Sequence, residues 1–239
     1  MGHLLRTHSG QYVSLKSSHS LNAPALVAEL GGSYAAKLGI HLGAINSDEI
    51  YKWFLAAILY GTRISEKIAS RTWHNLEKKH VLTPERVIST GWDELVTILD
   101  SGGYAHYDYK TATKLLDISS ALLDNYEGNL NTLHAAATDH NDLEKRIKDL
   151  GKGVGKVTAD IFLRELRGKW LKANPSLSLL AFNAAHSLGF LPRGVRNNRR
   201  LALTCLQHLW SENGMTAESF PDFEAALVRK GIYLRHSAA

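Results

Sequence analysis

Residues 143–166 read LEKRIKDLGKGVGKVTADIFLREL, and this stretch decides the fold. Apolar residues recur at helical spacing on both sides of a glycine-rich turn, which predicts helices over about Leu143–Leu150 and Lys156–Arg167. Three glycines in five residues allow a tight turn between the helices, and Gly153 and Gly155 permit positive φ and the close approach of another backbone. The stretch is therefore interpreted as a helical hairpin with a very short connection.

The beginning of the second helix of this hairpin is suited to an anion. Free backbone amides and the positive end of the helix dipole meet there, and Lys152 and Lys156 add charge. A phosphodiester is the natural occupant, and such a contact fixes position along a nucleic acid without reading its sequence. The alternative is an ordinary helical corner whose glycines are helix caps.

The remaining sequence is also helical in its periodicity, with no alternating strand pattern longer than a few residues and no internal repeat. The fully apolar run WFLAAILY predicts a buried central helix within Ile50–Tyr60, capped by Asn46 or Ser47. The fold class predicted is all-α. Further helices are expected at about Asn22–Leu38, Thr62–Lys79, Pro84–Thr90, Trp92–Asp100, Asp108–Tyr126, Ser176–Leu188, Asn197–Asn213 and Pro221–Lys230.

Composition limits the class of protein. Of 239 residues, 44 % are hydrophobic and 21 % charged, which is typical of a folded chain. No run of 18 apolar residues and no secretory signal are present, so we expect an intracellular protein without a membrane span. The one cysteine, Cys205, excludes an internal disulfide or an iron–sulfur cluster, and we interpret it as a core residue. The net charge of +5 favours polyanionic partners only mildly.

The hairpin resembles the helix-hairpin-helix of the endonuclease III-like DNA glycosylase superfamily. Gly153-Val154-Gly155 followed by Thr158-Ala159 matches that family's Leu-Pro-Gly-Val-Gly, two residues, then Thr-Ala. The similarity extends over roughly residues 50–190. It includes WFLAAILYGTRISEKIASRTW, GYAHYDYKTATKLLDISSALLDNYEG and LSLLAFNAAHSLGF.

The resemblance implies two helical lobes with a cleft between them and the hairpin at its rim. We expect residues 1–45 to belong to the second lobe and residues 46–165 to form the central lobe, with the helix-hairpin-helix at about 143–167. Residues 166–239 are expected to pack with the N-terminal segment. The DNA-binding residues implied are Gly151, Lys152, Gly153, Val154, Gly155, Lys156 and Thr158.

Two positions depart from the family pattern. The family's lyases carry a lysine nucleophile at the second residue after the last hairpin glycine, and here that residue is Val157. The family's aspartate, which stabilises positive charge developing on the sugar, aligns with Ser178. Weak catalytic candidates are Lys156, Asp160 and Ser178. The alternatives are a phosphate contact for Lys156, a tether for Asp160 and a helix cap for Ser178.

Two further groups are candidate DNA contacts. Tyr104, His106, Tyr107 and Tyr109 are interpreted either as a base pocket that stacks on an extruded base or as packing between the lobes. Arg63, Arg193 and Arg196 are interpreted as DNA contacts, with a solvated loop or a surface ion pair as the alternative.

The predicted function is DNA binding in base excision repair, in which a damaged or mismatched base is flipped into the cleft by a glycosylase-like protein with an unconventional or lost catalytic group. Three alternatives remain: an N-glycosylase, which is favoured, a non-catalytic damage-recognition protein, and an abasic-site lyase using Lys156. We expect a monomer that binds double-stranded DNA in the cytoplasm or nucleoid, or in a nucleus. No side-chain metal site or cofactor is expected, and the resemblance implies a monovalent cation on the hairpin's backbone carbonyls.

Overall fold

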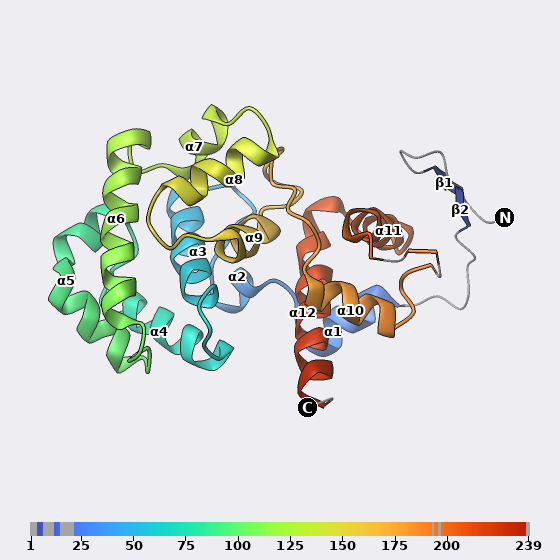
Figure 1. Cartoon of the computed structure of the whole chain (residues 1–239), viewed down its shortest axis with the longest axis horizontal. Coiled ribbons are helices and arrows are strands. Elements are labelled where there is room, and N and C mark those ends of the chain that lie inside the picture. The colour runs from blue at the N-terminus through green and yellow to red at the C-terminus, as the bar shows by residue number, and fades with distance from the viewer. Residues whose placement is uncertain (1–3, 7–11, 15–21, 193, 196, 238–239) are drawn as a thin grey trace. The chain divides into compact units, whose positions relative to one another are not determined.

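The computed structural model describes residues 4–6, 12–14, 22–192, 194–195 and 197–237, and their regular secondary structure is almost entirely helical (Figure 1). Two short strands, β1 (Leu4–Arg6) and β2 (Tyr12–Ser14), form an antiparallel pair. The helices are α1 (Ala23–Leu30), α2 (Tyr34–Lys37), α3 (Ser47–Tyr60), α4 (Glu66–Lys78), α5 (Pro84–Ser101), α6 (Asp108–Tyr126), α7 (Leu130–Ala136), α8 (His140–Asp149), α9 (Lys156–Glu165), α10 (Leu179–Ser187), α11 (Arg199–Glu212), the 3₁₀ helix η1 (Ala217–Ser219) and α12 (Phe220–Ser237). The all-α prediction is confirmed.

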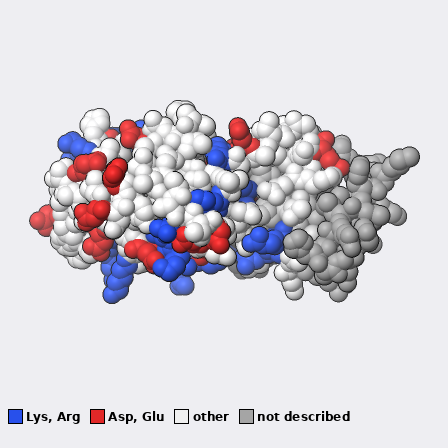
Figure 2. All heavy atoms as spheres, turned by 90° about the horizontal axis from the view of Figure 1, so that it is seen from above, with Lys and Arg blue, Asp and Glu red and all other residues white. Residues whose placement is uncertain are grey.

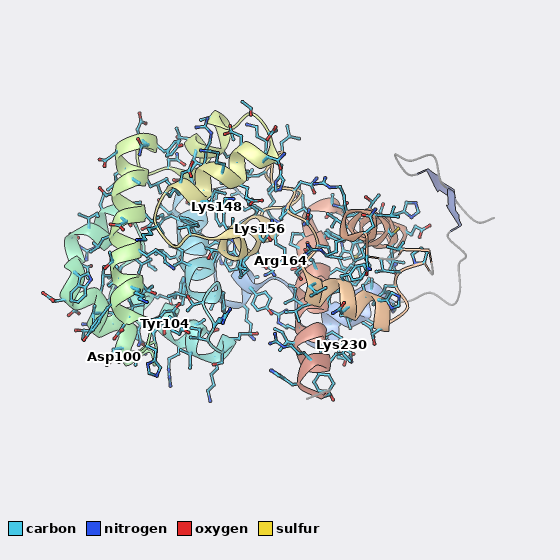
Figure 3. All side chains as sticks on the ribbon, viewed as in Figure 1. Asp100, Tyr104, Lys148, Lys156, Arg164 and Lys230 are labelled. Carbon is cyan, nitrogen blue, oxygen red and sulfur yellow. The ribbon has the colours of Figure 1, made fainter. Side chains whose placement is uncertain are left out.

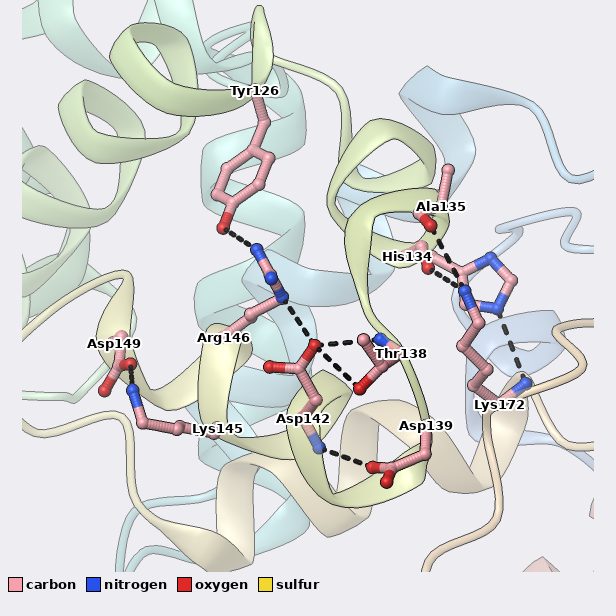
Figure 4. Close-up of polar contacts among 10 residues, drawn as sticks. All are labelled: Tyr126, His134, Ala135, Thr138, Asp139, Asp142, Lys145, Arg146, Asp149 and Lys172. Atoms are coloured by element: carbon pink, nitrogen blue, oxygen red, sulfur yellow. Dashed lines mark hydrogen bonds and ion pairs between the residues drawn. The ribbon is translucent and has the colours of Figure 1, made fainter.

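The chain divides into two compact units, residues 35–174 and residues 1–34 with 175–239. The sequence placed the boundaries at 45 and 165, but the segments next to them are attached to the first unit. Asn131 of α7 donates to the carbonyl of Ile45, and Trp170 donates to Asn131 and stacks on His134 with ring centroids 4.5 Å apart. Lys172 then donates to the carbonyls of His134 and Ala135, contacts shown in Figure 4.

In the unit of residues 35–174, α3 is the central helix, as its apolar run predicts. Every residue from Trp53 to Leu59 is buried, and α3 packs against α4, α7 and α9. Trp53 donates its indole N–H to the carbonyl of Phe162, and Phe54 lies 4.9 Å from the Phe162 ring. The hairpin helix α9 is therefore anchored directly on the core helix. Asn46 caps α3, accepting the amides of Asp48 and Glu49.

In the other unit, α12 packs against α1 and α10. The rings of Trp210 and Phe223 stack at 5.2 Å, and Arg229 donates to the carbonyl of Gly31. Gly231 lets α10 approach closely, because a Cβ at that position would overlap the carbonyl of Leu180. These contacts unite helices from the two ends of the chain.

Several predicted helix boundaries are wrong. The helix expected over Asn22–Leu38 is interrupted at Gly31, which adopts φ 83°, and the amide of Ser33 donates to Asp222 instead. Helix α4 begins at Glu66 rather than Thr62, because Ser65 caps it. Helix α7, capped by Asn129, was not predicted. The break expected at Gly91 is confirmed, since φ there is 74° inside α5. In the described part of the chain, no helix is both long and apolar enough to cross a membrane.

Candidate nucleic-acid interface

The hairpin consists of α8, the turn of residues 150–155, and α9. Asp139 caps α8 by accepting the amide of Asp142, and the Asp142 carboxylate accepts from Thr138 and Arg146 (Figure 4). The amide of Val154 donates to the carbonyl of Gly151 at 3.1 Å, which closes the turn. The first helix and the turn are thus fixed by their own polar contacts.

Two glycines let the turn pack closely on α6. A Cβ on Gly151 would lie 2.8 Å from Cγ1 of Ile118, and a Cβ on Gly153 would lie 2.9 Å from Cε of Lys114. Gly153 also has φ 89°, so it adopts the positive φ that glycine permits. The turn therefore requires glycine for both its backbone angles and its contact with α6.

Gly155 does not use the positive φ that glycine permits. Its backbone is extended, with φ −95° and ψ 177°. A Cβ on Gly155 would meet no atom of the described residues within 4 Å. Nothing in the described part of the protein therefore requires glycine at this position, and the space beside its Cα is open there.

Helix α9 begins without a side-chain cap. A side-chain oxygen accepts a first-turn amide at the start of α1, α3, α4, α5, α7, α8, α10 and α11. The N-cap residues of α6 and α9, Tyr107 and Gly155, accept none, and Gly155 has no side chain that could do so. The first residues, Lys156 and Val157, are exposed. Unsatisfied amides at an exposed helix start attract anionic oxygen.

The resemblance also implies a monovalent cation, which the carbonyl oxygens of the turn would have to hold. The carbonyls of Gly151 and Gly155 already accept the amides of Val154 and Ala159, and a carbonyl oxygen has a second lone pair for such an ion.

The start of α9 also packs against the loop that carries Arg63. Thr158 is buried, and its hydroxyl occupies the space where a Cβ of Gly61 would lie. Gly61 ends α3, and the exposed Arg63 lies two residues further on. The hairpin and the Arg63 loop are therefore neighbours.

Charges within the hairpin are largely paired, including those of Lys148 and Lys156, which Figure 3 labels. Lys156 donates to Asp160 at 2.9 Å and to Glu144 at 3.3 Å, and Lys148 donates to Glu144 at 3.1 Å. Burial by itself lowers the pKa of Lys156, but its bonds to Asp160 and Glu144 outweigh burial, so the net pKa is raised. A lysine with a raised pKa is a poor amine nucleophile. Asp160 is here the partner of Lys156.

Lys114 is a cation that the sequence did not single out. It comes from α6, 39 residues before Gly153, and the Nζ atom would lie 3.4 Å from a Gly153 Cβ. It is half-buried, and burial lowers the pKa of its ammonium group. Sequence spacing alone contains no signal for this contact, which depends on how α6 packs against the turn. Lys152 is exposed beside it.

The tyrosine cluster does not form one group. Tyr104 is buried, donates to the carbonyl of Leu59 at 3.1 Å, and has its pKa raised to about 12 by burial. Tyr107 packs edge-on against it at 6.1 Å, and His106 is exposed. Tyr109 is 61 % exposed and lies 5.3 Å from the ring of Trp92. Tyr104 is thus a core residue, and Tyr109 belongs to a surface pair.

The two positions that depart from the family pattern, Val157 and Ser178, carry neither an amine nor a carboxylate. Val157 is 61 % exposed and offers no ionisable group. Ser178 is the N-cap of α10, with its hydroxyl accepting the amide of Ala181 at 3.1 Å. Arg193 and Arg196 lie outside the described residues. Within the described residues, no three His, Cys, Asp or Glu side chains are arranged to hold a metal ion.

Comparisons with known proteins bear on this geometry. No family model matches the sequence, and no curated protein matches it. Among solved structures, the chain is similar to the crystal structure of H. pylori 3-methyladenine DNA glycosylase (MagIII) bound to 1,N6-ethenoadenine. The TM-score is 0.57 at 14 % identity, covering 92 % of this chain and 95 % of that one. The chain therefore shares the fold of that DNA glycosylase. The all-α, glycosylase-type fold that the resemblance implies is confirmed. In this glycosylase fold, residues 150–158 are the hairpin turn and the start of its second helix.

Proposed function

We propose that this glycosylase-fold protein binds double-stranded DNA by holding a backbone phosphate at the start of α9. The observation that carries the proposal is the uncapped, exposed helix start after Gly155, where the space beside the Cα is open. A phosphate oxygen can accept several of the free amides at once and also meets the positive end of the helix dipole. Such a contact grips any sequence equally.

The ion pairs of the hairpin indicate which lysines are available to a DNA phosphate. Lys156 is held by two carboxylates, so much of its charge is already neutralised within the hairpin. Among the described residues, no carboxylate lies within ion-pair distance of Lys152 or Lys114, and the two lysines flank the turn. We propose that these two lysines, rather than Lys156, supply the net positive charge for the phosphate. Arg63, on the loop packed against Thr158, is a further proposed backbone contact.

We propose that the protein recognises damaged or mismatched DNA and that no lysine acts as a nucleophile in it. Val157 and the capping hydroxyl of Ser178 provide neither an amine nor a carboxylate, and the raised pKa of Lys156 argues against an abasic-site lyase. Likeness to a glycosylase over most of the chain favours a second function, hydrolytic base excision through an unconventional group.

The binding proposal is tested with Gly155→Asp. Asp is a good N-cap, so this variant supplies the missing cap from within and leaves α9 at least as stable. It also places a negative charge where the phosphate would lie. Losing charge-assisted hydrogen bonds of about 1.5–3 kcal/mol predicts duplex affinity about ten- to hundred-fold weaker, measured by fluorescence anisotropy.

Gly43→Asp is the matched control. Gly43 lies in the same unit, its φ is not positive, and a Cβ there meets no atom within 4 Å, so the variant adds the same charge elsewhere. It should bind duplex nearly as tightly as the wild type. Equal affinity of Gly155→Asp and Gly43→Asp for duplex would overturn the proposal.

The two candidate activities are separated by incubating the protein with duplexes that each carry one lesion. The lesions are uracil, oxidised guanine, an oxidised pyrimidine, an alkylated purine, 1,N6-ethenoadenine or an abasic site. Release of one base, seen as alkali-induced strand cleavage, would establish the hydrolytic glycosylase. Preferential binding without base release would establish the recognition protein. A borohydride-trapped adduct at the abasic site would contradict the proposal that no lysine is a nucleophile.

A further inference from the structure

Helix α4 presents basic side chains along one face. Lys67, Arg71, His74 and Lys78 follow each other at intervals of four, three and four residues, which places them on a single stripe of an α-helix. All four are exposed. The opposite face is buried and consists of Ala69, Thr72, Trp73 and Leu76. The helix is therefore fixed by its apolar side, with its basic stripe in solvent.

Of the thirteen lysines in residues 35–174, Lys169 and Lys172 donate to backbone carbonyls, and the other eleven fall into two kinds. One kind is paired with a carboxylate: Lys37, Lys52, Lys79, Lys145, Lys148 and Lys156. The second kind has no carboxylate of the described residues within 4 Å, and residues 35–174 are all described. We call this second kind the lysine track. It consists of Lys67, Lys78, Lys110, Lys114 and Lys152. The track residues keep their charge available to a partner in solution.

The track is continuous with the hairpin. Arg71 of α4 donates to the carbonyl of Gly102 at 2.7 Å, which attaches the stripe to the loop before α6. Lys110 and Lys114 then lie one turn apart on α6, and Lys114 contacts Gly153 of the turn. Figure 2 shows Lys and Arg side chains projecting from one long edge of this unit, with Asp and Glu both at its end and among them along that edge.

We propose that the lysine track is the path of the DNA backbone beyond the hairpin, so that this inference rests on the proposed function. Unpaired ammonium groups in a row neutralise successive phosphates and release their counterions. Lys67 and Lys78 are 11 residues apart, about 16 Å along a helix at 1.5 Å per residue. With phosphates about 3.4 Å apart along the helix axis of one strand, this span matches about five nucleotides.

The test compares Lys67→Gln/Lys78→Gln with Lys79→Gln/Lys145→Gln. Both variants remove two exposed lysines, but only the first pair belongs to the track, since Lys79 and Lys145 are held by Glu94 and Asp149. The quantity measured is the slope of log affinity for an undamaged duplex against log salt concentration. Each lost phosphate contact lowers the slope by about 0.9, so the track variant should lose about 1.8 and the control close to zero.

The outcomes distinguish the two proposals. If the wild type binds duplex and the track variant keeps the wild-type slope, the track is not the DNA path, while the hairpin proposal stands. If the two double variants lose equal slope, the effect is one of net charge and the track is again overturned. If the wild type does not bind duplex at any salt concentration, the proposed function fails, and the inference fails with it.

Discussion

At the scale of single residues, the structure of the hairpin depends on its glycines, which have no Cβ atom. Gly153 was predictable, because a glycine in such a turn supplies positive φ. The extended backbone of Gly155 follows from its place before the first residue of α9, where the N-cap residue is ordinarily extended. Gly61 shows a third reason for glycine: its φ of −72° suits any residue, but Thr158 occupies the space beside it. That contact joins residues 97 apart in sequence, and local patterns give no signal for it.

Gly61→Ala should therefore destabilise the protein. The new methyl group overlaps Thr158 and lies 3.1 Å from the carbonyl of Ala57, and such overpacking costs about 1–3 kcal/mol. Urea unfolding of the variant measures the loss in the free energy of unfolding.

Gly43→Ala is the control for this prediction, because its methyl group enters open space. Replacing a flexible glycine there should be neutral or stabilising by up to about 1 kcal/mol. Thr158→Ala in the Gly61→Ala background should recover part of the loss, since it removes the overlapping hydroxyl. Equal stabilities of Gly61→Ala and Gly43→Ala would show that Thr158 does not press on Gly61.

At the scale of elements, caps and periodicity predict helices well and their interruptions less well. Helix α6 has the predicted bounds, and Asn46 caps α3 as expected. The break between α1 and α2 escaped prediction because it depends on Asp222, which is distant in sequence. In the hairpin, α8 is stabilised by ion pairs one turn apart, Arg146 with Asp142 and Lys148 with Glu144. These pairs could be read from spacing, but the link from Glu144 to Lys156 could not.

The hairpin should lose stability on acidification. Burial raises the pKa of Glu144, but its bonds to Lys148 and Lys156 prevail, so the folded pKa lies below the ordinary 4.5. The resulting stabilisation is present above pH 4.5 and is lost as the pH falls through the folded pKa. Because the lysine partners are exposed, the contribution is about 1 kcal/mol or less.

Urea unfolding at pH 7 and at pH 3 measures this loss. The wild type should lose more stability over that interval than Glu144→Gln, which has no carboxylate to titrate at this position. Identical losses in the two proteins would refute the stabilising role of Glu144.

At the scale of the whole molecule, the sequence predicted the helical class and the glycosylase-type fold, because the hairpin motif and the segments around it occur in a characteristic order. It placed the unit boundaries about ten residues away, since residues 35–45 and 166–174 are held by contacts to α3 and α7 that only the folded chain reveals. The residues proposed to bind DNA also differ in how far the sequence could predict them. Lys152 could be read from the turn, whereas Lys114 required the packing of α6.

The most direct test of DNA binding by the hairpin is an NMR titration of the ¹⁵N-labelled protein with an undamaged duplex. The amide signals of Lys156, Val157 and Thr158 should shift strongly, because their N–H groups begin an uncapped helix. The amide of Asp142 should shift little, because Asp139 already accepts its hydrogen at 2.9 Å. Saturable binding with the largest shifts elsewhere and none at residues 151–158 would contradict the account.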